Sequence, residues 1–230
     1  MSISVIIPVL NEAAGITQCL GQLLPYQGTV EIIVVDGGSQ DNTCDLVRQF
    51  PVILQETNGG RGKQMNQGAA IASGEILLFL HSDTQLPTGF PALVQTTLAD
   101  AQVIAGAFPL AIADARWSLR LVEKMVQWRS QIFSLPYGDQ GIFLRRRDFE
   151  RLGGYAELAI MEDYEFLQRL KKQGQIRLTE HPVLTSSRRW QKLGVWRTTW
   201  INQKVILGYH LGVDAEVLRQ WYQRQMTPST

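Results

Sequence analysis

The 230-residue chain carries 22 Lys and Arg against 21 Asp and Glu, and 45% of its residues are hydrophobic. This composition excludes a disordered polypeptide and supplies enough apolar material for one sizeable core. No apolar run reaches the ~18 to 20 residues of a membrane-spanning helix and the first residues lack the basic start of a signal peptide, so we expect a cytoplasmic protein, soluble or peripherally attached.

Short apolar runs bounded by turn residues come first along the chain, and they alternate with segments of helical composition. A strand–helix alternation of this kind predicts an α/β protein with a mostly parallel central sheet flanked by helices. The expected strands are residues 3–9, 30–35, 52–55 and 75–80, and the expected helices between them are residues 13–24, 42–49 and 62–72.

The alternation breaks down beyond Pro87, and no internal repeat replaces it. Here the pattern predicts helices at 88–100, 116–133 and 161–172, strands at 103–112, 142–145 and 176–184, and a helical C-terminus over 194–223. Cys19 and Cys44 lack the spacing of a zinc site or a disulfide framework, so we expect reduced, buried thiols.

Polar side chains follow the first, second and fourth expected strands. In an open parallel sheet the ligand crevice lies beyond the carboxyl ends of the strands, where Asn11, Glu12, Asp36 and residues 81–84 would gather. Such a set could bind a nucleotide and a cation.

Two common nucleotide sites are disfavoured. The turn after the first strand is Asn11-Glu12-Ala13-Ala14-Gly15 and lacks the G-x-G-x-x-G of a dinucleotide fold. The glycine-rich run that begins at Gly59 does not match a Walker A loop, because Thr57 stands at the first glycine position and Gln64 replaces the metal-binding Ser or Thr.

Four motifs occur in a fixed order: Ile-Pro-Val-Leu-Asn-Glu ending at Glu12, Val-Val-Asp-Gly-Gly-Ser-Gln-Asp-Asn-Thr ending at Thr43, Gly-Arg-Gly-Lys-Gln-Met-Asn ending at Asn66, and Phe-Leu-His-Ser-Asp-Thr ending at Thr84. Together they resemble the family 2 glycosyltransferases of GT-A fold, in particular a small bacterial subgroup of radical-SAM and selenodomain-associated transferases. The resemblance covers about residues 2–190. It implies a GT-A domain at 1–193, with a nucleotide-binding half at 1–84 and an acceptor half at 85–193, before a helical extension at 194–230.

The donor side of the site is inferred from this resemblance. It implies that Asp36 contacts the base or ribose, where a carboxylate can accept hydrogen bonds from N–H or hydroxyl groups. The alternative is that Asp36 and Ser39 only organise a turn and cap the next helix. The other expected nucleotide-binding residues are Pro8, Asn11, Glu12, Gly60, Lys63 and Ser82.

Asp83 occupies the position of the last Asp in the Asp-x-Asp signature of the family, and His81 replaces the first. The resemblance implies a divalent cation on Asp83, Mg²⁺ or Mn²⁺, with Mn²⁺ favoured if the imidazole of His81 joins the ligands. A purely structural role is the alternative for His81.

The catalytic pair is expected at Glu162 and Asp163, which open a helix. By resemblance, Asp163 is the general base toward the acceptor hydroxyl. The alternative is that both carboxylates only favour the positive end of the helix.

The resemblance implies inverting, metal-dependent transfer of a sugar from a nucleotide-sugar donor to a hydroxyl. A nucleotidyltransferase and a non-catalytic nucleotide-sugar-binding protein remain as alternatives. The acceptor would be selected by loops such as residues 135–140, and no nucleic-acid partner is expected. Ser186 replaces the Gln of the Gln-x-x-Arg-Trp motif that ends at Arg189-Trp190, which argues against processive polymerisation.

The two parts of the chain differ in charge: residues 1–115 carry 3 basic and 10 acidic residues, and residues 116–230 carry 19 and 11. The C-terminal segment places Trp196, Trp200, Leu207 and Leu211 on one helical side. Packing on the domain is the expected role of this side. Peripheral contact of residues 194–223 with a membrane is the alternative, and it would make a lipid-linked acceptor plausible.

Overall fold

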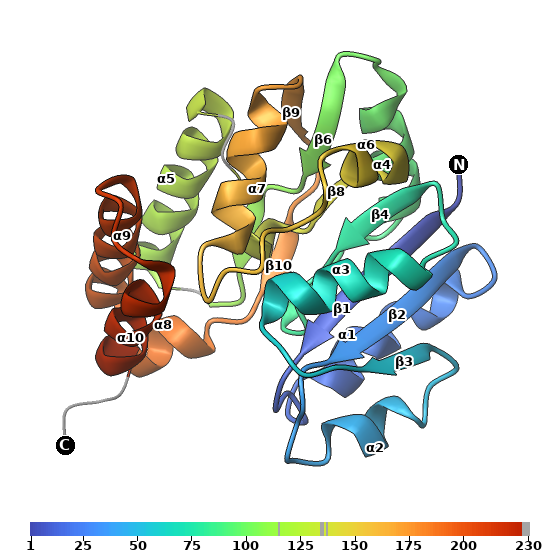
Figure 1. The fold of residues 1–230 in the computed structure, drawn as a ribbon, viewed down its shortest axis with the longest axis horizontal. Helices are drawn as coiled ribbons and strands as arrows, with labels where there is room; N and C mark the ends of the chain where they lie inside the picture. Colours follow the sequence, from blue (N-terminus) through green and yellow to red (C-terminus); the bar gives the residue numbers. More distant parts are fainter. Residues whose placement is uncertain (115, 134–135, 137, 227–230) are drawn as a thin grey trace.

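A computed structural model describes residues 1–114, 116–133, 136 and 138–226. Its centre is a seven-stranded sheet in the order β3-β2-β1-β4-β8-β6-β9, in which β8 is antiparallel to β4 and β6 and the other neighbours are parallel (Figure 1). The strands are β1 (Ile3–Val9), β2 (Val30–Asp36), β3 (Ile53–Glu56), β4 (Ile76–Phe79), β6 (Val103–Ala107), β8 (Ile142–Arg145) and β9 (Gln175–Leu178).

Three short strands form a second, separate sheet. In it β10 (Val183–Thr185) pairs antiparallel with β5 (Thr84–Gln85) and parallel with β7 (Leu110–Ile112). Because β5 follows the fourth strand almost directly, this sheet brings residues after Thr185 to the mouth of β4.

Helices cover both faces of the large sheet. Those on the sheet faces are α1 (Ile16–Gly21), α2 (Thr43–Val47), α3 (Arg61–Ile71), α4 (Phe90–Ala99), α6 (Arg146–Arg151) and α7 (Glu162–Lys171). The other helices are α5 (Trp117–Phe133), α8 (Arg188–Leu193), α9 (Val195–His210) and α10 (Ala215–Met226), and 3₁₀ turns lie at Leu24–Tyr26 and Gly138–Gln140.

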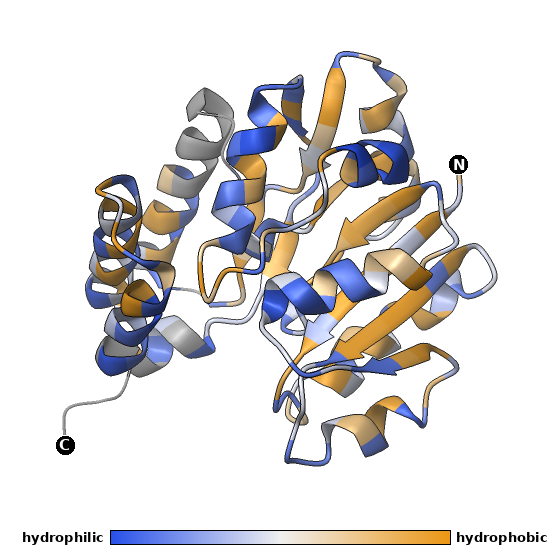
Figure 2. Cartoon of the chain, viewed as in Figure 1, coloured by the Kyte–Doolittle hydropathy of each residue, from blue (hydrophilic) through white to orange (hydrophobic). Residues whose placement is uncertain are grey.

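The core has two parts because side chains alternate across each strand. Val5 and Ile7 of β1 point to the side that α1, α2 and α4 cover, whereas Ile6 points to the side of α3, α6 and α7. The inner strands β1, β2, β4 and β6 are apolar on both faces, as expected of a sheet covered on both sides, whereas the edge strands β3 and β9 are partly polar (Figure 2). The predicted α/β class with a mostly parallel sheet and a helical C-terminal part is confirmed.

The first four strands are confirmed to within one or two residues. Two longer strand predictions are wrong, because residues 103–112 and 176–184 each divide between the two sheets. Pro109 has no N–H for a ladder, and its carbonyl accepts the amide of Val183 at 2.9 Å where the chain enters the small sheet. The strand β5 and the short helices α6 and α8 were not predicted.

The C-terminal helices form a third apolar cluster with α7. Met161 and Tyr164 pack against Val205 of α9 and Leu218 of α10, and the Tyr164 hydroxyl lies 2.6 Å from His210 Nε2. No helix in the described part of the chain is both long and apolar enough to cross a bilayer. The predicted domain boundary after residue 193 coincides with Gly194 between α8 and α9, and the division itself stays a prediction.

Both cysteines are free, as expected, but the expected burial holds for Cys19 and is wrong for Cys44. Cys19 is buried and its burial raises the pKa of its thiol to about 12, whereas Cys44 is half-buried with a pKa raised to about 11, mainly by burial. Neither thiol is therefore ionised near neutral pH.

Candidate active site

The loops after β1 and β2 are held together by the side chain of Gln64. Its amide nitrogen donates to the carbonyl oxygens of Val9 at 2.7 Å and Val35 at 2.8 Å, from a position that is 4% exposed. A Cβ on Gly37 would lie 3.0 Å from that amide, so a residue without a side chain suits this close approach. These contacts place the N-terminus of α3 beside the ends of β1 and β2.

Asp36 ends β2 and is 2% exposed. Its carboxylate accepts the amides of Gly38 and Ser39, both at 2.8 Å, and the hydroxyl of Ser39. The turn-organising role considered for Asp36 and Ser39 is therefore present, although no cap bond to α2 accompanies it. Contact of Asp36 with a base or ribose stays a prediction.

Asn11 and Glu12 follow β1 and are tied to other loops. Asn11 has a left-handed backbone with φ of 55°, its amide donates to Ser39 Oγ at 2.8 Å and its side-chain oxygen accepts the amide of Gln40 at 2.8 Å. Glu12 forms an ion pair with Arg188 of α8 at 3.3 Å. These contacts tie the loops at the mouth of the sheet to one another.

Asp83 lies in a tight turn directly after β4. The turn is closed by the Thr84 amide, which donates to the His81 carbonyl at 3.1 Å, and the Asp83 carbonyl accepts the amide of Ser186 at 3.0 Å. This second bond brings α8 and its Arg188 to the same place. Asp83 lines an open hollow of about 180 Å³, called here the Asp83 hollow, together with Ala14, Gly15, Gln18, Cys19, Ser82, Thr84, Gln85, Ser186 and Arg188.

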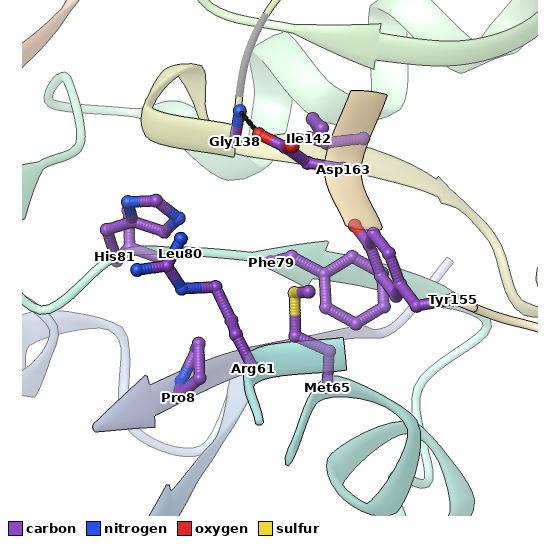
Figure 3. Close-up of a pocket in the computed structure, with 10 residues that line it drawn as sticks. All are labelled: Pro8, Arg61, Met65, Phe79, Leu80, His81, Gly138, Ile142, Tyr155 and Asp163. Atoms are coloured by element: carbon purple, nitrogen blue, oxygen red, sulfur yellow. Dashed lines mark hydrogen bonds between the residues drawn. The ribbon is translucent and has the colours of Figure 1, made fainter. Parts of the chain in front are cut away.

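Asp163 lines a second hollow, called here the Asp163 hollow, whose lining includes His81 but not Ser82 or Asp83 (Figure 3). Its Oδ2 accepts the amide of Gly138 at 2.9 Å and its Oδ1 accepts the amide of Tyr164 at 2.7 Å. This hollow has room for about one water, with a volume of 10 Å³, and is lined by Pro8, Arg61, Met65, Phe79, Leu80, His81, Gly138, Ile142, Tyr155 and Asp163.

Gly138 separates Asp163 from His81. A Cβ at residue 138 would stand 3.0 Å from Asp163 Oδ2 and 3.1 Å from His81 Nε2, so both side chains approach this glycine closely. Residues 81, 138 and 163 are far apart in the sequence, and β4, the 3₁₀ turn before β8 and α7 bring them together. Of the predicted specificity loop 135–140, residues 135 and 137 lie outside the described part of the chain.

Glu162 and Asp163 have different surroundings. Glu162 is 4% exposed and its carboxylate lies 3.6 Å from the guanidinium of Arg61. Burial, and then the charge of Asp163, raise the pKa of Glu162, while Arg61 opposes the rise. Met161, which precedes the pair, has a φ of 70°, a strained conformation for a non-glycine residue that helps to aim the first turn of α7.

Few of the described side chains near the two hollows are placed to bind a metal ion. Within the described ranges no group of three or more His, Cys, Asp or Glu side chains is placed to hold a metal ion. Mg²⁺ and Mn²⁺ bound with a nucleotide keep waters and phosphate oxygens as ligands, so one protein carboxylate in an open hollow fits that mode. Asp83 offers such a carboxylate, whereas His81 lines the other hollow.

The remaining predicted residues surround these hollows. Pro8 lines the Asp163 hollow and Ser82 the Asp83 hollow, while Gly60 precedes the first residue of α3. Lys63 packs its side chain against Gly59, and it is the neighbouring Arg61 that lines the Asp163 hollow. The assignment of these residues to nucleotide binding stays a prediction.

Sequence reasoning missed Gly138 and Arg188. Gly138 begins the sequence Gly-Asp-Gln-Gly, which is typical of a turn. The sequence therefore signals the turn, but it does not show that the turn contacts Asp163. Arg188 stands one residue before the Arg-Trp pair that drew attention, and no sequence pattern linked it to Glu12. Trp190 is buried in the main core, and the side chain of Arg189 lies outside the described part.

Comparison with known proteins gives one family. The sequence pattern described as "Glycosyl transferase family 2" matches residues 4–153. A "PGL/p-HBAD biosynthesis glycosyltransferase" of Mycobacterium bovis is 29% identical over 176 residues, which cover 71% of this chain and 67% of that protein.

Solved structures agree with this result. A mannosyltransferase from Pyrobaculum calidifontis in complex with GDP-Man and Mn²⁺ superposes with a TM-score of 0.67 at 22% identity, covering 88% of this chain and 61% of its own. TarS of S. aureus in complex with UDP-GlcNAc superposes with a TM-score of 0.66 at 21% identity, covering 82% and 59%. The chain thus spans about three fifths of these two proteins, and the likeness confirms the GT-A fold.

Proposed function

The chain belongs to glycosyl transferase family 2, and we propose that it transfers a sugar from a nucleoside-diphosphate sugar to an acceptor hydroxyl with inversion of configuration. The observation that carries the proposal is the placement of Asp163. Its carboxylate, held by two backbone amides, faces a hollow at the mouth of β1 and β4, where a parallel sheet binds its ligands.

The donor would lie across the loops after β1, β2 and β4. Both hollows are smaller than the ~300 Å³ at which ligand sites begin, so the nucleotide would extend along the open mouth and enter them only in part. Pro8, Asn11, Glu12, Asp36, Gly60, Lys63 and Ser82 are the proposed nucleotide contacts. Amide groups at the start of α3 favour a phosphate there, because the helix dipole is positive at that end.

Asp83 is the proposed ligand of Mn²⁺ or Mg²⁺. His81 was the expected second ligand, but its side chain lines the Asp163 hollow and not the Asp83 hollow, so the proposal depends on Asp83. The bound cation would supply positive charge to the departing diphosphate. Solved glycosyltransferases of this fold include complexes with Mn²⁺, which supports the choice of metal.

Asp163 would act as general base. In the proposed step an acceptor oxygen bonds to the anomeric carbon from the face opposite the diphosphate, the bond between that carbon and the phosphate oxygen breaks, and Asp163 takes the proton of the hydroxyl. The amides of Gly138 and Tyr164 orient the carboxylate. Glu162, buried beside Arg61, would fix the first turn of α7 rather than exchange a proton with the acceptor.

The proposed acceptor is a hydroxyl carried on a lipid-linked molecule. The protein would meet it at the cytoplasmic face of a membrane, through peripheral contact of residues 194–223. The radical-SAM and selenodomain-associated subgroup, and the division at residue 193, belong to the same proposal.

A donor screen tests the proposal. UDP-, GDP- and dTDP-sugars are added with and without Mn²⁺, and the shift in thermal midpoint is recorded, since a ligand bound only by the folded state raises it. The tight donor is then incubated with the protein and the products are separated. We expect a nucleoside diphosphate and a sugar of inverted anomeric configuration, from slow hydrolysis when no acceptor is present.

Other products would overturn the proposal. Release of pyrophosphate would identify a nucleotidyltransferase, donor binding without turnover would identify a nucleotide-sugar-binding protein, and a sugar of retained configuration would exclude the single displacement.

A further inference from the structure

The outer side of α9 exposes large apolar side chains, contrary to the packing expected from the sequence. Trp196, Trp200, Leu207 and Leu211 are 64%, 64%, 61% and 73% exposed. Their spacing of four, seven and four residues places them along one side of the helix. They are called here the α9 stripe.

The opposite side of α9 is fixed to the protein. Thr198, Ile201, Val205 and Gly208 are buried, and His210 at the end of the helix contacts Tyr164 of α7. The orientation of α9 is therefore set by packing, and the α9 stripe is left on the outside. In Figure 1 the helix lies at the edge of the molecule far from the strands β2 and β3.

A neighbouring helix repeats this pattern. Trp117, Leu121 and Met125 of α5 are exposed and recur every four residues, and α5 contacts α9. By contrast α10 exposes one large apolar side chain in its described part, Val217, and buries Leu218 against α9. The outward apolar surface of the C-terminal region thus lies on α9 and its neighbour α5, and not on the whole segment 194–223.

Charge indicates what covers the α9 stripe. Residues 181–213 contain five Arg and Lys, at 188, 189, 192, 197 and 204, and no Asp or Glu. Lys204 extends over Trp200, with its Nζ 5.7 Å from the ring centroid, so a basic group and an aromatic ring share the surface. On α9 itself the basic side chains are Arg197 and Lys204. A second copy of the chain would bring like charges against them, which costs free energy, whereas an anionic surface complements them.

We propose that the α9 stripe docks on an anionic lipid bilayer. Tryptophan favours the boundary between headgroups and acyl chains, and a helix with apolar and basic sides lies in that boundary. The inference deepens the proposed function and rests on it only for the acceptor, which would then be a lipid-linked hydroxyl reaching the Asp163 hollow from the membrane.

The docked helix is connected to both sides of the site. The helix α8, which leads into α9, supplies Arg188 to Glu12 beside the Asp83 hollow, and the far end of α9 contacts α7 one residue beyond Asp163. A bilayer held against the α9 stripe therefore has a fixed position relative to both hollows.

Vesicle flotation tests the inference with the full chain. Vesicles of phosphatidylcholine alone are compared with vesicles that also contain about 30% phosphatidylglycerol, because anionic lipid attracts basic segments. We expect flotation with the anionic vesicles only, reversed by salt. Replacing both tryptophans, Trp196→Ser with Trp200→Ser, should weaken it by about tenfold or more, and Arg197→Gln with Lys204→Gln by about thirtyfold.

Matched controls are available outside α5 and the C-terminal helices. Ile53→Ser with Ile71→Ser removes two exposed apolar residues, and Arg147→Gln with Lys172→Gln removes two exposed basic residues; neither pair should change flotation. The thermal midpoint of every variant shows whether it is folded. Donor binding in solution by the tryptophan variant should equal that of the wild type.

Three flotation results would overturn the inference: no flotation of the wild type, equal flotation with neutral vesicles, or unchanged flotation of a folded tryptophan variant. The inference would also fail if the wild type were a dimer, the tryptophan variant were a monomer, and neither protein bound vesicles. Donor turnover is measured separately. Flotation without donor binding would reject the proposed function and leave the membrane face standing, and donor turnover without flotation would do the reverse.

Discussion

The two sides of the crevice are built differently. On the donor side, Asn11 and Gln64 bond to the backbone of other loops and the buried Asp36 bonds to its own, so the loops after β1 and β2 are held together. On the acceptor side, Asp163 also accepts two backbone amides, but its carboxylate lines a hollow and follows the strained Met161.

Substitutions on the two sides should therefore change different measured properties, the stability of the fold on one side and the turnover rate on the other. A donor-side substitution removes internal hydrogen bonds and should therefore act first on folding. An acceptor-side substitution moves a carboxylate that faces a hollow and should act first on turnover, with little effect on the thermal midpoint.

The largest effect is expected at the proposed base. Asp163→Asn keeps the size of the side chain but cannot accept the acceptor proton, so kcat should fall by about 10² to 10⁴-fold. The change is measured by product formation under saturating donor, and Asp45→Asn, an exposed carboxylate paired with Arg48, serves as the control. Wild-type turnover by Asp163→Asn would remove this residue from the mechanism.

The next effect tests whether Gly138 spaces the two sides of the Asp163 hollow. In Gly138→Ala the new methyl group would crowd both Asp163 and His81, so we expect turnover to fall by about ten- to a hundredfold through misplacement of the base. Gly21→Ala is the control, because a Cβ at residue 21 meets nothing within 4 Å. Unchanged kcat in a folded Gly138→Ala protein would show that the spacing is not needed.

A donor-side change should act on stability instead. Gln64→Ala removes the amide that joins the carbonyls of Val9 and Val35, and the free energy of unfolding should fall by about 1–3 kcal/mol. Urea unfolding measures it. The control is Gln55→Ala, at a half-buried side chain whose amide bonds the carbonyl of the adjacent Glu56, and it should change stability by less than about 0.5 kcal/mol. Equal losses in the two variants would contradict the role of Gln64 in holding the loops together.

The smallest effect concerns Glu162 and pH. Because its pKa is raised in the folded protein, ionising it costs stability, and that cost grows as pH rises above the ordinary value of 4.5 and through the folded pKa. Glu162→Gln removes this ionisation. We therefore expect the thermal midpoint of the variant, relative to that of the wild type, to rise between acid and neutral pH. A difference in midpoint that is the same at every pH would contradict the raised pKa.

The same contrast explains what the sequence could predict. The strands β1 to β4 and the residues that follow them were predictable because each is a local apolar run with its polar residue next to it. Asp36 and Asp83 were singled out by the same route and by family resemblance, and Asp163 by the resemblance, and their roles stay predictions. The fold class followed from the alternation of strands and helices.

The missed features depend on contacts between distant segments. Arg188 reaches Glu12 across 176 residues, and Gly138 reaches Asp163 across 25, so neither pairing has a local signal. The division of residues 103–112 and 176–184 between two sheets depends on pairing partners rather than on the apolar pattern. The exposure of the α9 stripe was hidden for a similar reason, because periodicity shows that a helix has an apolar side but not what covers it.

We propose that Asp83 binds the cation that contacts the donor diphosphate. Asp163 would take part in proton transfer and not in donor binding. Calorimetry of the donor selected by the screen, with Mn²⁺ present, tests it in wild type, Asp83→Asn and Asp163→Asn. The account predicts that Asp83→Asn loses the Mn²⁺-dependent part of the affinity, by about tenfold or more, and that Asp163→Asn binds like the wild type. Undiminished Mn²⁺-dependent binding by a folded Asp83→Asn protein would contradict it.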